Sequence, residues 1–102
     1  MASFRELLQQ TKSEIREVDT QQADELRSQP GAVVLDVREP DEHEQGAIPG
    51  SLHIPRGQLE SNIESRVTDR ATPLVVFCAG GTRSALATKT LGDLGYTDVV
   101  SV

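Results

Sequence analysis

The sequence predicts an α/β fold in which a mostly parallel sheet carries helices on both of its faces. Residues 32–35 and 74–77 are short, fully apolar runs, as expected for strands that are buried on both sides. Segments with helical spacing of apolar residues alternate with the strand candidates, and this order requires right-handed crossovers between parallel strands. The 102 residues are enough for one compact domain and too few for two.

The N-terminal segment predicts a peripheral arm. Residues 3–12 have the pattern of a polar, amphipathic helix in which Ser3 and Glu6 are placed as a capping box. We therefore divide the chain into a helical arm over residues 1–14 and a domain over residues 15–102.

The first half of this domain predicts one helix and one acidic loop between short strands. The helix starts at Asp19 and ends near Ser28. Proline and glycine residues in the acidic segment 38–50 exclude a long helix there but allow a turn or two over residues 41–45. The strand candidates are residues 15–18, 32–35 and 52–54.

The second half predicts two helices and two strands. Apolar residues recur every four positions over residues 58–67, which is typical of a helix with one buried stripe. Residues 74–77 form the clearest strand of the chain, and a second helix follows and ends near Gly95. A last strand is expected over residues 98–102.

The composition excludes several classes of function. Ten basic and sixteen acidic residues give a net charge of −6, and no stripe of Lys and Arg is present, so we expect no nucleic-acid partner. No apolar run approaches the roughly 20 residues that span a bilayer, and the N-terminus lacks the pattern of a signal peptide. We therefore expect a cytoplasmic protein that does not enter a membrane. With three aromatic residues and no Trp, the core must be mainly aliphatic.

The single cysteine, Cys78, is the main candidate for chemistry. One Cys excludes an internal disulfide and a zinc site built from several thiolates, and the two histidines lack the spacing of a metal site, so we expect no metal. Cys78 directly follows a buried strand, where open α/β sheets place their active sites. It is either a small buried hydrophobe or a nucleophile.

The residues after Cys78 favour the nucleophile. Small residues allow the backbone to curl around the sulfur with its N–H groups directed inward, as a site for an anion above the start of a helix. Arg83 adds a permanent positive charge, and these features together are expected to lower the pKa of the thiol. The anion-binding loop comprises Ala79, Gly80, Gly81, Thr82 and Arg83, with Ser84 in support.

The spacing between Cys78 and Arg83 separates two chemistries. Tyrosine and dual-specificity phosphatases place five residues between these groups and enclose a phosphate, whereas four intervene here. The shorter loop encloses a smaller volume, which suits one added sulfur atom better than a phosphoryl group. Persulfide chemistry is the sharper hypothesis. A phosphatase or arsenate reductase, and a non-catalytic docking module that uses the acidic segment, are the alternatives.

Two motifs resemble the single-domain rhodaneses. The run Cys78-Ala79-Gly80-Gly81-Thr82-Arg83 is similar to the active-site loop of that family. The segment from Asp36-Val37-Arg38 through Glu42 to Gly46-Ala47-Ile48-Pro49-Gly50 is similar to its second signature. Ala47 and His43 depart from the usual residues of this signature, and we expect effects on packing or solvation there.

The resemblance implies a three-layer α/β sandwich with a five-stranded sheet and a sulfurtransferase of the thiosulfate:cyanide class. Cys78 would carry sulfane sulfur as a persulfide, with no other cofactor. The loop amides would hold the persulfide, and Arg83 would orient the loop or an anionic donor. Asp36 and Arg38 would form either a brace of the site or a direct part of it.

The resemblance also bears on partners. The donor would be thiosulfate or a protein persulfide, and the acceptor a thiophile. A general likeness to rhodanese domains attached to E1-like adenylyltransferases suggests a sulfur-carrier protein or an adenylyltransferase domain as partner, in molybdopterin or thiamine synthesis. Family members usually continue past the last strand with a closing helix, whereas this chain stops at Val102, so we expect that helix to be missing.

Overall fold

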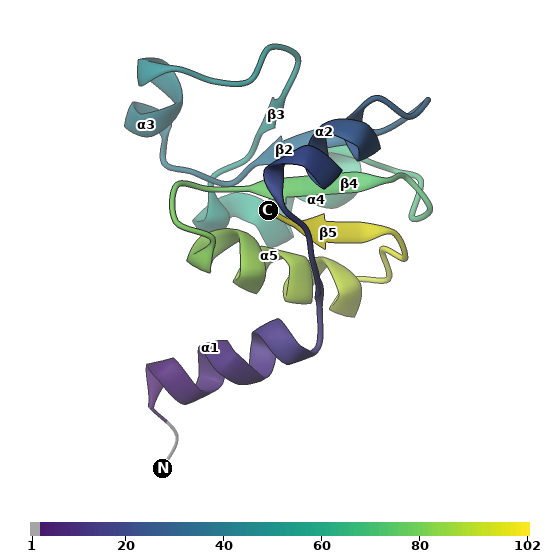
Figure 1. The fold of residues 1–102 in the computed structure, drawn as a ribbon. Helices are drawn as coiled ribbons and strands as arrows, with labels where there is room; N and C mark the ends of the chain where they lie inside the picture. Colours follow the sequence, from purple (N-terminus) through teal and green to yellow (C-terminus); the bar gives the residue numbers. More distant parts are fainter. Residues whose placement is uncertain (1–2) are drawn as a thin grey trace.

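A five-stranded, wholly parallel sheet organises the protein. The computed structural model describes residues 3–102, and its strands lie in the order β1-β5-β4-β2-β3 (Figure 1). Every strand pair is parallel, as the alternation of strands and helices predicts. The strands are β1 (Arg16–Glu17), β2 (Val33–Asp36), β3 (Leu52–His53), β4 (Leu74–Phe77) and β5 (Val99–Ser101).

The helices form a layer on each side of this sheet. In Figure 1, α4 and α5 lie on one side and α2 on the other. The sequence prediction of an α/β sandwich with helices on both faces is confirmed. The helical elements are α1 (Phe4–Ser13), α2 (Thr20–Arg27), α3 (Pro40–Gln45), the 3-10 turn η1 (Arg56–Gln58), α4 (Leu59–Arg66) and α5 (Thr82–Asp93).

Side-chain alternation along the strands produces two apolar cores. Leu74 and Val76 of β4 point to the side of α4 and α5, where Leu35 and Leu91 are fully buried. Val75, between them in the strand, points to the side of α2 and packs in a smaller cluster with Ala23 and Val100. The larger core is aliphatic apart from Tyr96, which fits the low aromatic content of the sequence.

Helix starts agree closely with the capping signals in the sequence. Asp19 accepts a hydrogen bond from the N–H of Gln22, whose side chain accepts one from the N–H of Asp19, so α2 begins with a complete capping box. At α1, one of the two hydrogen bonds of the expected capping box forms, from the N–H of Glu6 to the side chain of Ser3. The short helix expected in the acidic loop is α3, which begins at Pro40.

Helix α1 lies at the periphery and packs against α5 (Figure 1). An ion pair between Lys89 of α5 and Glu14 joins the two segments. Phe4 and Leu7 of α1 remain 61% and 51% exposed. Among residues 3–102, no helix has both the length and the apolar content that a membrane crossing requires.

We expect Leu35→Ala to lower the free energy of unfolding by about 2–5 kcal/mol, because the side chain is fully buried in a central strand and its removal leaves a cavity. Urea denaturation followed by circular dichroism measures the change. Leu7→Ala deletes the same atoms from a half-exposed position of α1 and is the matched control. A loss as large in Leu7→Ala as in Leu35→Ala would contradict this assignment of the core.

Candidate active site

Cys78 lies at the carboxyl end of the central strand β4, where the chain turns into α5. Gly81 caps this helix with φ of +85°, in the left-handed region that other residues adopt at a cost. This conformation reverses the chain within three residues of the sulfur. Thr82 and Arg83, which the sequence placed in the loop, begin α5, and Ser84 follows them in its first turn.

Backbone N–H groups surround the sulfur of Cys78. The N–H of Gly81 donates to Sγ at 3.1 Å and that of Ser84 at 3.3 Å, and the hydroxyl of Ser84 lies 3.5 Å away. Partial burial raises the pKa of the thiol, but hydrogen bonds from Ser84 and from the backbone of Gly80 and Gly81 outweigh it, so the pKa lies below its ordinary value. The thiolate is therefore stabilised by neutral dipoles.

Ser84 joins this arrangement to the neighbouring strand β5. Its side chain is fully buried, and its oxygen accepts a hydrogen bond from the hydroxyl of Ser101 in β5 at 3.0 Å. The Ser84 hydroxyl also lies within hydrogen-bond distance of the carbonyl oxygens of Gly81 and Val102. Sequence reasoning assigned Ser84 a supporting role but gave no sign of the contact with Ser101, which is 17 residues away.

Asp36 and Arg38 form a buried brace next to the site. The Asp36 carboxylate is fully buried and accepts hydrogen bonds from Nε and Nη2 of Arg38 at 3.0 and 2.9 Å and from Nδ1 of His43 at 3.0 Å. Burial raises the pKa of Asp36, but the bonds from Arg38 and His43 lower it to about 2. Arg38 also donates to the carbonyl oxygen of Gly46 at 2.7 Å. Of the two roles expected for this pair, the geometry favours the brace.

The two histidines hold α3 against β3. Their rings stack with centroids 4.1 Å apart and planes at 5°. His43 Nδ1 donates to Asp36, since a carboxylate oxygen only accepts, and His53 Nε2 donates to the carbonyl oxygen of Arg38 at 2.8 Å. Both histidines therefore support the brace.

Glu42 of α3 is paired with Arg83 of the active-site loop. Nη1 and Nη2 of the guanidinium bond the two carboxylate oxygens, the second at 3.0 Å. Hydrogen bonding to Arg83 is the main cause that lowers the pKa of Glu42 to about 2. The permanent positive charge expected at Arg83 is therefore offset by the carboxylate of Glu42. Glu42 stands in the second sequence motif, but the sequence gave it no partner.

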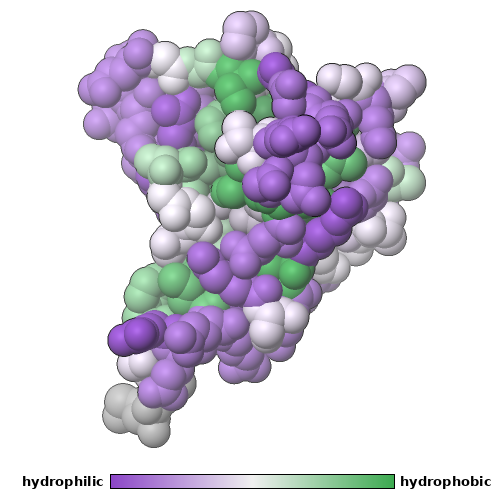
Figure 2. All heavy atoms as spheres, viewed as in Figure 1, coloured by the Kyte–Doolittle hydropathy of each residue, from purple (hydrophilic) through white to green (hydrophobic). Residues whose placement is uncertain are grey.

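A groove on the α2 side of the sheet opens beside Cys78. It encloses about 380 Å³ and is lined mainly by apolar side chains, including those of Val34, Val75 and Phe77 from the sheet and of Ile48 and Pro49. Apolar atoms are visible between the hydrophilic surfaces of α3 and α2 in Figure 2. A molecule with an apolar body can therefore approach the sulfur from this side.

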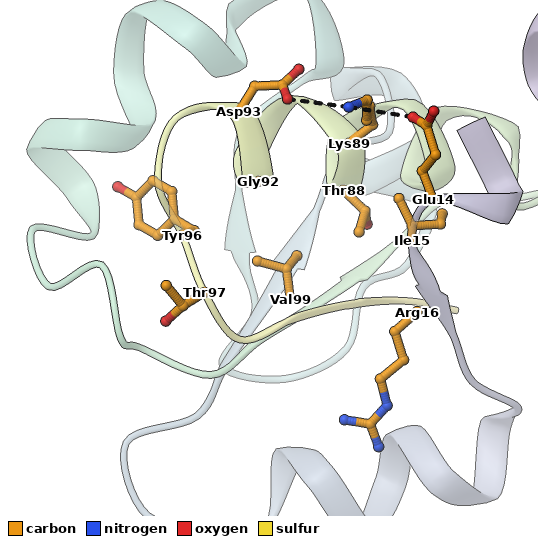
Figure 3. A pocket seen from close by; sticks show the side chains of 10 residues that line it. All are labelled: Glu14, Ile15, Arg16, Thr88, Lys89, Gly92, Asp93, Tyr96, Thr97 and Val99. Carbon is orange, nitrogen blue, oxygen red and sulfur yellow. Dashed lines mark hydrogen bonds and ion pairs between the residues drawn. The ribbon is translucent and has the colours of Figure 1, made fainter. Parts of the chain in front are cut away.

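A second hollow lies away from the thiol, between α5 and the chain that joins α1 to β1 (Figure 3). It encloses about 230 Å³, and Lys89 spans its rim through ion pairs with Glu14 and Asp93. Neither Cys78 nor any residue of its loop lines this hollow. Residues 3–102 also bring together no group of three or more His, Cys, Asp and Glu side chains that could hold a metal ion.

The model of the rhodanese-like domain matches residues 19–102, which include both motifs and the groove. The chain belongs to the rhodanese-like family. Its sequence is 39% identical over 90 residues to a thiosulfate sulfurtransferase GlpE of Ectopseudomonas mendocina, covering 88% of this chain and 80% of the relative.

Solved structures agree with this assignment. A human single-domain sulfurtransferase matches with a TM-score of 0.70 and 30% identity, over 82% of this chain and 85% of that one. A Rhodopseudomonas palustris protein of unknown function, described as a possible tyrosine phosphatase, matches with a TM-score of 0.87 and 34% identity, over 98% and 83%. The protein is therefore a rhodanese-type sulfurtransferase. Attachment to an adenylyltransferase domain stays a prediction.

We expect Ser84→Ala to raise the pKa of Cys78, because the variant loses a hydroxyl that stabilises the thiolate. The pH dependence of alkylation by iodoacetamide reports this pKa as its midpoint. Ser101→Ala removes the neighbouring hydroxyl of the same network without touching Sγ, so its midpoint is expected to stay near that of the wild type. Equal shifts in both variants would contradict a direct role of the Ser84 hydroxyl.

We expect the free energy of unfolding of Asp36→Asn to depend less on pH in the acidic range than that of the wild type. A carboxyl whose pKa falls from 3.8 to about 2 on folding contributes about 2 kcal/mol above pH 4, and this is lost as the pH falls towards 2. The variant lacks this contribution at neutral pH and therefore loses less on acidification. Urea denaturation at several pH values measures the free energy of unfolding of each variant, and Asp98→Asn is the control at an exposed residue. If the free energy of unfolding of Asp36→Asn fell with acidification as much as that of the wild type, the role of the brace would be contradicted.

Proposed function

We propose that the protein carries sulfane sulfur as a persulfide on Cys78 and delivers it to a thiophilic acceptor. The thiolate attacks the outer sulfur of a donor such as thiosulfate, the bond between the two donor sulfurs breaks, and sulfite leaves with its electron pair. The acceptor, cyanide or a thiolate, then attacks the outer sulfur of the persulfide and regenerates the Cys78 thiolate. No step needs an external oxidant or a further cofactor.

One observation carries this proposal: the sulfur of Cys78 receives two backbone N–H groups at the start of α5. The same dipoles favour a thiolate as attacking group and as leaving group, which are its roles in the two half-reactions. The outer sulfur of a persulfide is also anionic and would lie above the loop. We assign the support of that sulfur to the remaining loop amides, from Ala79 to Arg83.

The relatives support sulfur transfer, while the pathway is a further proposal. One structural match is a polysulfide-sulfur transferase homodimer from Wolinella succinogenes, with a TM-score of 0.78 and 30% identity over 95% of this chain and 74% of that one. We propose that the groove beside Cys78 receives the body of the acceptor. A sulfur-carrier protein, as in molybdopterin or thiamine synthesis, would present its C-terminus there.

Phosphoryl transfer is the second candidate, because the Rhodopseudomonas palustris relative is described as a possible tyrosine phosphatase. That reaction uses an arginine to stabilise three charged phosphoryl oxygens. Arg83 instead directs its guanidinium to Glu42. The geometry therefore favours sulfur transfer over phosphoryl transfer.

We expect the wild-type protein to gain the mass of one sulfur atom on incubation with thiosulfate, and a reducing thiol to remove it. Cys78→Ser should lose both the mass gain and the turnover of thiosulfate with cyanide, since serine forms no persulfide. Intact mass spectrometry and the assay of thiocyanate measure the two effects. Retention of either property in Cys78→Ser, or faster hydrolysis of an aryl phosphate than sulfur transfer by the wild type, would contradict the proposal.

A further inference from the structure

We propose that Glu42 is a specificity-determining residue that disfavours dianionic sulfur donors by neutralising Arg83. This inference rests on the proposed persulfide mechanism and concerns the charge of the donor. It predicts that Glu42 raises the kcat/KM for a monoanionic donor, such as a thiosulfonate, relative to the kcat/KM for a dianionic donor. Without the charge of Glu42, this preference would be smaller.

The geometry of the pair is the first step. Both side chains are about 70% buried, with exposed fractions of 30% for Arg83 and 29% for Glu42. Two parallel hydrogen bonds fix the guanidinium on the carboxylate. A partly buried pair is screened less by salt than an exposed one, so the charge of Glu42 offsets that of Arg83 at the mouth of the site.

The surrounding charges reinforce this effect. Arg38 is paired with the fully buried Asp36, and Arg27, which lines the groove beside Cys78, with Asp24. Glu39, which directly precedes α3, is a second carboxylate whose charge acts on Arg83. The wall of the site that faces Arg83 is therefore acidic, and Figure 2 shows the hydrophilic surface over α3.

The two N–H groups that contact the sulfur of Cys78 do not offset the second negative charge of a dianionic donor. Two N–H groups already serve the Cys78 sulfur, which is itself negative as a thiolate. Thiosulfate brings two negative charges to this anion and leaves as sulfite, which has two. Methanethiosulfonate brings one and leaves as methanesulfinate, which has one. Each donor transfers one sulfane sulfur atom to the Cys78 thiolate. The ratio of their kcat/KM values therefore reports mainly how the site responds to the charge of the donor.

Glu42→Gln isolates the charge from the structure. The Oε1 atom of Glu42 accepts a hydrogen bond from the N–H of Glu39 at 3.0 Å and so caps α3. The glutamine side chain has the same shape and retains an oxygen that can accept from Glu39 or Arg83. The variant therefore removes one negative charge and keeps the cap of α3.

The experiment compares kcat/KM for thiosulfate with kcat/KM for methanethiosulfonate, with the same thiol acceptor, in wild type and variants. We expect Glu42→Gln to raise the thiosulfate to methanethiosulfonate ratio about five- to tenfold at low ionic strength, the effect of one unit charge a few ångströms from the donor. The gain should shrink in about 0.5 M NaCl. Arg83→Gln should shift the ratio in the opposite direction, because it leaves Glu42 unneutralised.

Glu44→Gln is the matched control, since it makes the same change of charge on the same helix at an exposed residue. We expect its ratio to stay within about twofold of the wild-type value, because water screens exposed charges. Effects on thiolate formation act on both donors and cancel in the ratio, and circular dichroism verifies that each variant is folded.

The outcomes separate this inference from the function on which it rests. If both donors load Cys78 but Glu42→Gln leaves the ratio unchanged, or Glu44→Gln changes it equally, Glu42 does not set specificity and the sulfurtransferase mechanism stands. If neither donor adds sulfur to Cys78 of the wild type, the persulfide mechanism itself fails, and the role of Glu42 fails with it.

Discussion

The in-register parallel pairing of β2 with β4 is the constraint on which the site depends. Asp36 lies opposite Phe77, so both strands end at the same level and at the same edge of the sheet. Cys78 follows one strand end and Arg38 the other, and Arg38 lies over the Phe77 ring at 5.4 Å. A shift of one residue in this register would point Asp36 to the opposite face and separate the brace from the loop.

The electrostatic design of the site rests on neutralised charges and oriented dipoles. Arg38 is held by the carboxylate of Asp36 and Arg83 by that of Glu42. The arginines therefore act mainly as connectors between segments, and the N–H groups at the start of α5 stabilise the thiolate. Such dipoles are fixed by the helix, so they stabilise the anion without the reorganisation that mobile side chains or water would need.

Local patterns predicted most of the fold and the centre of the site. The capping residues Asp19 and Gln22 set the start of α2, and continuous apolar runs marked β2 and β4, because caps and buried strands depend on adjacent residues. The position of Cys78 between a strand and a glycine-rich turn indicated the nucleophile. The pairing of Arg83 with Glu42 was not predicted, since the two residues are 41 positions apart in the sequence.

The sequence by itself determined the order of strands and helices along the chain, indicated Cys78 as the candidate nucleophile and placed Gly95 at the end of α5, because each follows from short-range periodicity or backbone conformation. The tertiary structure alone decided which charges meet. It joined Ser84 to Ser101, stacked His43 on His53 and paired Glu42 with Arg83. Contacts between distant residues depend on how the crossovers bring the strand ends together, and the polar pattern of the sequence leaves many such pairings open.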